Sequence, residues 1–169
     1  FSDQGAVQEV TRVELHARLG REGLENASGA RIKNLRRERR RRGRPRGVID
    51  VSRIAALKSI TVTDKAVITG AAVVQADAMR SDVIGKEVPL LALGLPWVGH
   101  FQTRNRGTLG GSVAHADPSA EIPLCLVVCG GTVVLQSRKR ERRVPAVEFF
   151  QGALTTQRQY DELVVALEW

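Results

Sequence analysis

The sequence is poor in cysteine and in aromatic residues, and both shortages exclude classes of protein. Its 169 residues include two cysteines, Cys125 and Cys129, too few for a disulfide framework and without a zinc-binding pattern. Aromatic residues make up 4% of the chain, so we expect no stacking platform for single-stranded nucleic acid. No apolar run approaches the ~20 residues that a membrane-spanning helix needs, and no secretory signal peptide is recognisable. A cytoplasmic protein without a membrane span is expected.

The net charge of +8 comes mainly from one segment. Residues 36–46 read RRERRRRGRPR, which is eight arginines and one glutamate. Like charges at this density repel one another, and no apolar stripe opposes them, so the segment is expected to be solvated or disordered. The run is also compatible with contacts to RNA or DNA phosphates. It contains no aromatic residue, however, and nucleic-acid binding is not the preferred interpretation.

Hydrophobic patterning predicts a mixture of helices and strands without a regular βαβ order, which favours the α+β class. The predicted helices are residues 6–19, 72–80, 87–95 and 121–128, and the predicted strands are residues 48–51, 60–63, 66–70, 132–135 and 163–167. Residues 103–112 are rich in glycine and predict a turn. Cys125 and Cys129 are expected to be buried small hydrophobes, and Trp97 is expected to pack in the core.

The densest chemical signal is the glycine-rich turn Gly107-Thr108-Leu109-Gly110-Gly111-Ser112. Glycines without Cβ atoms let a ligand approach the backbone, and successive exposed N–H groups form a concave site for anionic oxygens. The hydroxyls of Thr108 and Ser112 can donate to phosphate, and Asp117 and Glu121 add acceptors for ribityl or ribose hydroxyls. Asp117 or Ser119 is alternatively a cap for the following helix. The turn matches neither the G-x-G-x-x-G dinucleotide pattern nor a Walker loop. A turn that only connects two elements is the alternative interpretation.

The stretch His100 to Pro123, HFQTRNRGTLGGSVAHADPSAEIP, resembles the second flavin-binding loop of the FAD-binding medium subunits of molybdenum hydroxylases. That family includes subunits of carbon monoxide, xanthine and aldehyde dehydrogenases. Similarity extends over about residues 47–169, through VIDVSRI at 48–54, ITGA at 68–71, RVP at 143–145 and DEL at 161–163.

The resemblance implies a FAD-binding PCMH-type fold, which is vanillyl-alcohol oxidase-like and has two α+β subdomains. Residues 1–57 would form a divergent first subdomain and residues 58–169 the second, with the family's C-terminal domain absent. The resemblance places the cofactor at Gly107, Thr108, Leu109, Gly110, Gly111, Ser112, Asp117, Glu121 and the backbone near Leu163. It implies no side-chain catalytic residue and no metal ligand, because the flavin carries the chemistry.

The implied function is that of an oxidoreductase subunit. Electrons would pass from iron–sulfur clusters through FAD to NAD or another acceptor, and the expected partners are a molybdenum-cofactor large subunit and a 2Fe–2S small subunit. The alternative is a non-catalytic truncated remnant, or a basic nucleic-acid-binding protein that acts through residues 36–46.

The family's first FAD loop, of the form Ala-Gly-Gly-(Thr/Gln)-x-Leu, is expected near Gly29. The sequence there reads GARIKN, without the glycine pair and the leucine. A shifted reading frame over a short stretch is a hypothesis that explains this departure at preserved spacing, and resequencing of the coding DNA tests it.

Overall fold

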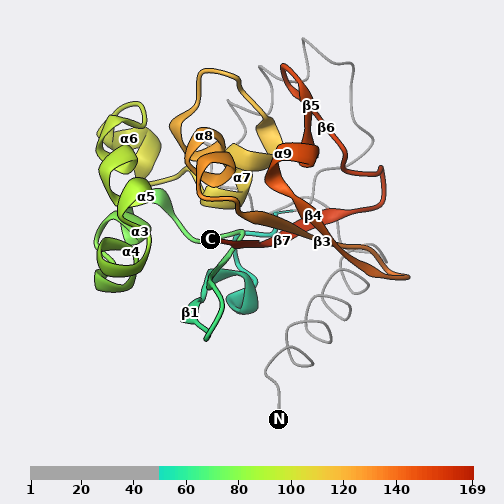
Figure 1. Ribbon diagram of the computed structural model, residues 1–169, viewed down its shortest axis with the longest axis horizontal. Helices are drawn as coiled ribbons and strands as arrows, with labels where there is room; N and C mark the ends of the chain where they lie inside the picture. The colour runs from blue at the N-terminus through green and yellow to red at the C-terminus, as the bar shows by residue number, and fades with distance from the viewer. Residues whose placement is uncertain (1–49) are drawn as a thin grey trace. The chain divides into compact units, whose positions relative to one another are not determined.

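The computed structural model describes residues 50–169, and a five-stranded antiparallel sheet organises them (Figure 1). The predictions for the helix at 6–19, the first loop near Gly29 and the arginine-rich segment 36–46 lie outside the described residues. Residues from Ala55 to Trp169 belong to one compact unit. The predicted boundary after residue 57 stays a prediction.

The last strand of the chain lies at the centre of the sheet. The strand order is β1, β2, β7, β3, β4, and every neighbouring pair is antiparallel. The strands are β1 (Ile60–Val62), β2 (Val67–Gly70), β3 (Thr132–Gln136), β4 (Glu141–Pro145) and β7 (Leu163–Glu168). Because β7 pairs with β2 on one side and with β3 on the other, it joins the β1–β2 hairpin to the β3–β4 hairpin in one sheet.

A bulge in β7 connects the sheet to the segment after β2. Val134 pairs with Ala166 and Leu135 pairs with Val164, so Val165 is the extra residue between them. A residue displaced from the ladder in this way is free to bond elsewhere. The Val165 carbonyl accepts a hydrogen bond from the Ala71 amide at 2.9 Å, which fixes the chain just beyond β2.

The helices of the described residues are short, and all except α9 lie between β2 and β3 in the sequence. They are α3 (Gln75–Met79), α4 (Asp82–Glu87), α5 (Pro89–Gly94), α6 (Phe101–Arg104), α7 (Leu109–His115), α8 (Glu121–Val128) and α9 (Ala146–Phe149). Two 3₁₀ turns, η1 (Ala55–Lys58) and η2 (Leu95–Trp97), and a small hairpin of β5 (Phe150–Gly152) and β6 (Thr155–Thr156) complete the fold. No helix among the described residues is long and apolar enough to cross a membrane.

The α+β class is confirmed, and so are the predicted strands at 60–63, 66–70, 132–135 and 163–167 and the helix at 121–128. The helix predicted over 72–80 is present but shorter, as α3. Three predictions need correction. Asp50 and Val51 are not in a strand, because Asp50 Oδ1 accepts from the Ser52 amide in a local turn. The helix predicted over 87–95 begins at Pro89 and continues into a 3₁₀ turn after Gly94. Part of the turn predicted at 103–112 is helical, because α7 begins at Leu109.

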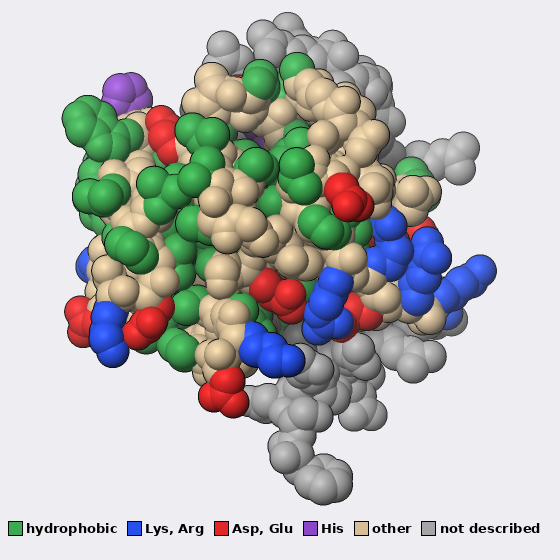
Figure 2. All heavy atoms as spheres, viewed as in Figure 1, with side chains coloured by type: hydrophobic (Ala, Val, Ile, Leu, Met, Phe, Trp, Pro, Cys, Tyr) green, Lys and Arg blue, Asp and Glu red, His purple; other side chains and the backbone are tan. Residues whose placement is uncertain are grey.

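Two residues assigned to packing are exposed instead. Trp97 is 78% exposed at the end of η2, and Cys129 is exposed as the residue that caps the end of α8. Cys125 is buried, as expected. Figure 2 shows how hydrophobic side chains gather on the face that carries α5, α6 and α8. Apolar residues in short helices with few polar positions do not reveal which side faces the core.

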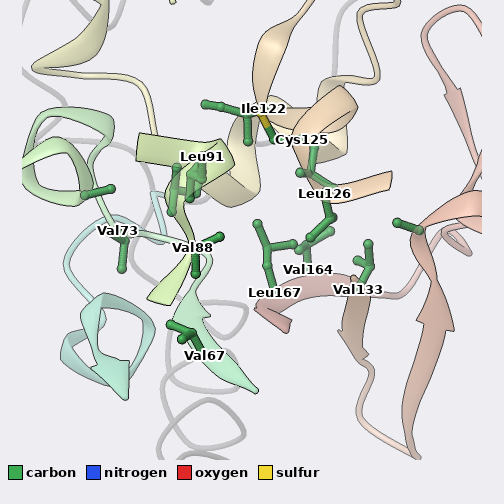
Figure 3. Packing of buried hydrophobic residues seen from close by; sticks show 14 of the residues in the cluster. Val67, Val73, Val88, Leu91, Ile122, Cys125, Leu126, Val133, Val164 and Leu167 are labelled. Carbon is green, nitrogen blue, oxygen red and sulfur yellow. The ribbon is translucent and has the colours of Figure 1, made fainter. Parts of the chain in front are cut away.

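The hydrophobic core lies between the sheet and helices α5, α7 and α8 (Figure 3). Leu126 of α8 points toward Val133, Val164 and Leu167 of the sheet, and α5 packs beside α8. Burial of a leucine or valine side chain contributes about 1.5–3 kcal/mol. The framework that carries the segment between α6 and α7 is therefore stabilised by many such contacts.

Candidate functional site

The predicted site segment is fixed by a short antiparallel bridge between Val74 and Thr108. The Gln75 amide donates to the Gly107 carbonyl at 2.9 Å, and the Leu109 amide donates to the Val73 carbonyl at 2.9 Å. In a pair flanked by hydrogen bonds in this way, the bridge residue's own N–H and C=O point away from its partner. The Thr108 carbonyl accepts from the Ser112 amide, and the Thr108 N–H has no hydrogen-bond partner among the described residues.

Thr108 is the N-cap residue of α7. Its backbone is extended, at φ −113° and ψ 158°, and its Oγ1 accepts a hydrogen bond from the Gly111 amide at 3.0 Å. A hydroxyl that accepts in a cap still has its own proton to donate. Thr108 therefore presents two donors, the backbone N–H and the hydroxyl, next to the exposed backbone of Gly111.

Gly110 is required by packing within the chain, whereas Gly107 lies against the end of the Gln75 side chain. A Cβ at Gly110 would lie 2.4 Å from Ala71 Cβ and 2.6 Å from Ala71 Cα. A Cβ at Gly107 would lie 2.8–2.9 Å from the side-chain amide of Gln75. The groups that approach Gly107 and Gly110 most closely here belong to the protein itself, and contact of these residues with a ligand stays a prediction. Gly111 is exposed, and a Cβ there would contact only Thr108.

The expectation that successive backbone N–H groups of this segment are available to an anion needs correction. Leu109, Gly110, Gly111 and Ser112 all donate their N–H groups within the chain, to Val73, Ala71, Thr108 Oγ1 and Thr108 respectively. The donors that remain for an anion are the Thr108 N–H and the hydroxyls of Thr108 and Ser112.

Asp117 lies beyond the other end of α7, after Ala116, which adopts a left-handed conformation at φ 53°. Asp117 Oδ1 accepts hydrogen bonds from Ser119 Oγ at 2.7 Å and from the Ser119 amide at 2.9 Å. These two bonds lower the pKa of the Asp117 carboxyl, which is thus ionised at neutral pH. Neither Asp117 nor Ser119 caps α8, whose N-cap is Ala120 and has no side-chain cap bond.

The predicted site residues occupy two ends of a helix and the start of a strand. The seven residues of α7, at a rise of about 1.5 Å each, separate Thr108 from Asp117 by roughly 10 Å. Glu121 is the first residue of α8, and Leu163 begins β7 opposite Gln136. Only an elongated ligand can contact all of these positions. The structure directly joins the glycine segment to β7 through Ala71, which accepts from the Gly110 amide and donates to Val165.

Gln75 is a polar residue of this region that the sequence did not single out. It is buried, its side chain lies against Gly107, and its Oε1 has no hydrogen-bond partner. Its position in the apolar run Val73-Val74-Gln75-Ala76 is the only signal that marks it. No cluster of metal-ligating side chains is found within residues 50–169.

The donor set at Thr108 and Ser112 fits an anionic diphosphate, and the Asp117 carboxylate fits a hydroxylated chain. Residues 27–168 match the family described as the FAD-binding domain in molybdopterin dehydrogenase. The chain therefore belongs to this family, which binds FAD and contributes subunits to molybdenum hydroxylase-type dehydrogenases. The predicted family and cofactor are confirmed.

Individual relatives are dehydrogenase subunits. The 6-hydroxypseudooxynicotine dehydrogenase complex subunit alpha of Paenarthrobacter nicotinovorans is 35% identical over 125 residues, which are 74% of this chain and 42% of that subunit. The glyceraldehyde dehydrogenase medium chain of Sulfolobus acidocaldarius is 32% identical over 124 residues, 73% of this chain and 44% of that one. The chain thus spans less than half the length of these two relatives.

Solved structures show the same fold. A carbon monoxide dehydrogenase from Hydrogenophaga pseudoflava, in a form that lacks the Mo-pyranopterin moiety of its molybdenum cofactor, matches with a TM-score of 0.77. The two sequences are 31% identical, and the match covers 96% of this chain and 55% of that chain.

Proposed function

We propose that the segment from Gly107 to Ser112 binds the diphosphate and ribityl part of FAD. The observation that carries the proposal is the geometry of Thr108, whose N–H and hydroxyl proton are both available for donation beside the exposed Gly111. Charge-assisted hydrogen bonds to phosphate oxygens are short and strong, so two donors on one fixed residue give a specific contact. The Ser112 hydroxyl adds a third donor.

The other predicted positions complete the proposed site. Asp117 is ionised and accepts hydrogen bonds, so it suits the hydroxyl groups of the cofactor. Glu121 is half-buried one element further on, and the backbone at Leu163 is the position proposed to lie near the flavin ring. Because the positions are spread over the length of α7, the cofactor is expected to lie extended along this helix.

The proposed role is electron transfer. Bound FAD supplies two-electron redox chemistry, while the protein supplies position and electrostatics. We infer that the chain works with a molybdenum-cofactor large subunit and a 2Fe–2S small subunit, and that the final acceptor is NAD or another oxidant. The relatives named as a medium chain and as a subunit of a dehydrogenase complex support this assembly. The cytoplasm stays the predicted location.

Absorption spectroscopy of the purified full chain tests the proposal. After incubation with FAD and removal of the free cofactor, a flavin band that elutes with the protein is expected. A Ser112→Ala variant, which removes one donor without touching the Thr108 cap, is expected to bind FAD several-fold more weakly. A Ser59→Ala variant serves as a comparison, because Ser59 is exposed and lies outside every position proposed to contact the cofactor. A protein that never retains flavin refutes the proposal and favours a non-catalytic role.

A further inference from the structure

The turn between β3 and β4 is held in one conformation and carries three exposed cations. Ser137 Oγ accepts from the amides of Lys139 and Arg140, each at 3.2 Å, and the Ser137 amide donates to the Arg140 carbonyl at 2.9 Å. Arg138, Lys139 and Arg140 are therefore presented to solvent from a fixed backbone.

A second segment, residues 157–162, is pinned beside this turn by a buried ion pair. The Glu162 side chain is 1% exposed and accepts from Arg142 Nε at 2.7 Å, from Arg142 Nη2 at 2.9 Å and from the Gln159 amide at 2.8 Å. Arg142 also donates to Gln157. The pairing lowers the pKa of the Glu162 carboxyl and keeps it charged. This arrangement fixes Arg158, whose Nη1 donates to the carbonyls of Gln159 and Glu162.

We call Arg138, Lys139, Arg140 and Arg158 the basic patch. Arg138, Lys139 and Arg158 form no ion pair with a described residue, and Arg140 reaches only Glu162, at 3.9 Å, whose charge Arg142 already balances. Asp161 is the exposed carboxylate within the same loop, which leaves an excess of three positive charges. Figure 2 shows the blue side chains gathered at the right, over the end of the β3–β4 hairpin in Figure 1.

Strand β7 leads from this patch to the proposed flavin segment. Glu162 immediately precedes Leu163, and Val165 bonds to Ala71, which contacts Gly110. Three residues of strand span about 10 Å. Electrostatic potential in water at 0.1 M salt decays over about 10 Å. The glycine segment therefore lies beyond one decay length from the patch side chains. Leu163, the position proposed for the flavin ring, directly follows Glu162 and pairs with Gln136, the residue before the turn, so the field of the patch acts there at low salt.

We propose that the basic patch selects anionic electron acceptors and raises the rate at which they reach the reduced flavin. This inference rests on the proposed function. It names the acceptor class as anionic small molecules, such as a dinucleotide that carries a diphosphate, in preference to neutral quinones. Clustered charge of one sign raises the association rates of oppositely charged ligands by factors of 10 to 10³, and the effect falls with salt. A neutral acceptor gains nothing from the same field.

The experiment uses the full chain loaded with FAD, reduced with one equivalent of dithionite and mixed with excess ferricyanide. Each reduced FAD passes one electron to each of two ferricyanide ions, which become ferrocyanide, and releases two protons. The neutral acceptor 1,4-benzoquinone is measured in parallel. The variant is Arg138→Glu/Lys139→Glu/Arg140→Glu, and a milder variant with glutamine at the three positions guards against misfolding.

A matched control keeps the total charge change equal. Arg39→Glu/Arg40→Glu/Arg41→Glu alters the arginine-rich segment by the same six units. We expect the patch variant to slow ferricyanide about tenfold at low salt, to invert the salt dependence, and to leave benzoquinone unchanged. Equal ferricyanide rates in the wild type and the patch variant, or an equal loss in the control, would overturn the inference.

A second readout does not depend on flavin. Hexacyanochromate(III), a paramagnetic anion, is expected to broaden the NMR amide signals of residues 138–140 and 158, and to lose this effect in the patch variant. Absence of broadening at these residues overturns the inference. Failure to retain FAD refutes the proposed function by itself, and the broadening experiment still decides whether the patch binds anions.

Discussion

Gly110→Ala is the substitution for which the structure allows the most detailed expectation. A new Cβ would lie 2.4 Å from Ala71 Cβ, 2.6 Å from its Cα and 2.8 Å from its carbonyl oxygen. Carbon atoms in contact are normally about 3.5–4.0 Å apart, so a shift of more than about 1 Å is required. Ala71 cannot withdraw freely, because its amide bonds to Val165 and its carbonyl accepts from Gly110.

The magnitude follows from three contributions. Forcing a methyl group into a packed contact costs about 1–3 kcal/mol, and a weakened hydrogen bond costs about 1 kcal/mol. Replacing glycine by alanine within a helix returns up to about 1 kcal/mol. The net loss is about 1–3 kcal/mol in the free energy of unfolding, which lowers Tm by roughly 4–12 °C for a unit of this size.

Gly85→Ala is the matched control. Gly85 also lies in a helix, is exposed, and would place its Cβ in open space with nothing within 4 Å. Helix propensity alone then applies, and a stabilisation of up to about 1 kcal/mol is expected. Urea unfolding followed by far-UV circular dichroism compares the two variants. If Gly110→Ala is as stable as the wild type, or if both variants change alike, the packing argument at Ala71 is refuted.

The remaining predictions concern three side chains. Thr108→Asp and Thr108→Asn both retain an N-cap acceptor for α7, so the two variants are expected to have similar stability. The negative charge of the aspartate should make FAD binding to Thr108→Asp at least tenfold weaker than to Thr108→Asn, as measured by fluorescence titration. Gln75→Met removes a buried acceptor without a partner and should be neutral or stabilising by about 1 kcal/mol, while Gln75→Glu buries an unpaired charge and should destabilise the protein in urea melts. Glu162→Gln should cost about 2 kcal/mol at pH 7, because Arg142 loses its carboxylate. Since the folded-state pKa of Glu162 is lowered from 4.5, the difference from the wild type should persist above the unfolded-state pKa and vanish as the pH falls through the lower folded-state value; a constant difference down to pH 2 contradicts this assignment.

Local sequence patterns predicted the elements whose own residues determine them. The run Glu121–Val128 is apolar and forms α8, and the β-rich runs at 60–63 and 132–135 form strands. Short helices such as α4 and α6 could not be predicted in this way, because six or four residues give too little periodicity. The exposure of Trp97 was missed for a related reason, since apolar character does not reveal which face of a short turn is covered.

The sequence by itself determined the family and the cofactor, because the 24 residues around the glycine-rich turn combine several uncommon features in a fixed order. Only the tertiary structure decided what each residue does there. Gly110 is needed for its close contact with Ala71, and the amides of four successive residues are used within the chain. The free donors are consequently concentrated at Thr108. The basic patch likewise joins residues 138–140 to Arg158, and their proximity depends on the pairing of β3, β4 and β7 and on the buried Arg142–Glu162 pair. Contacts between residues distant in the sequence depend on strand register and side-chain packing, and neither is encoded in a local pattern.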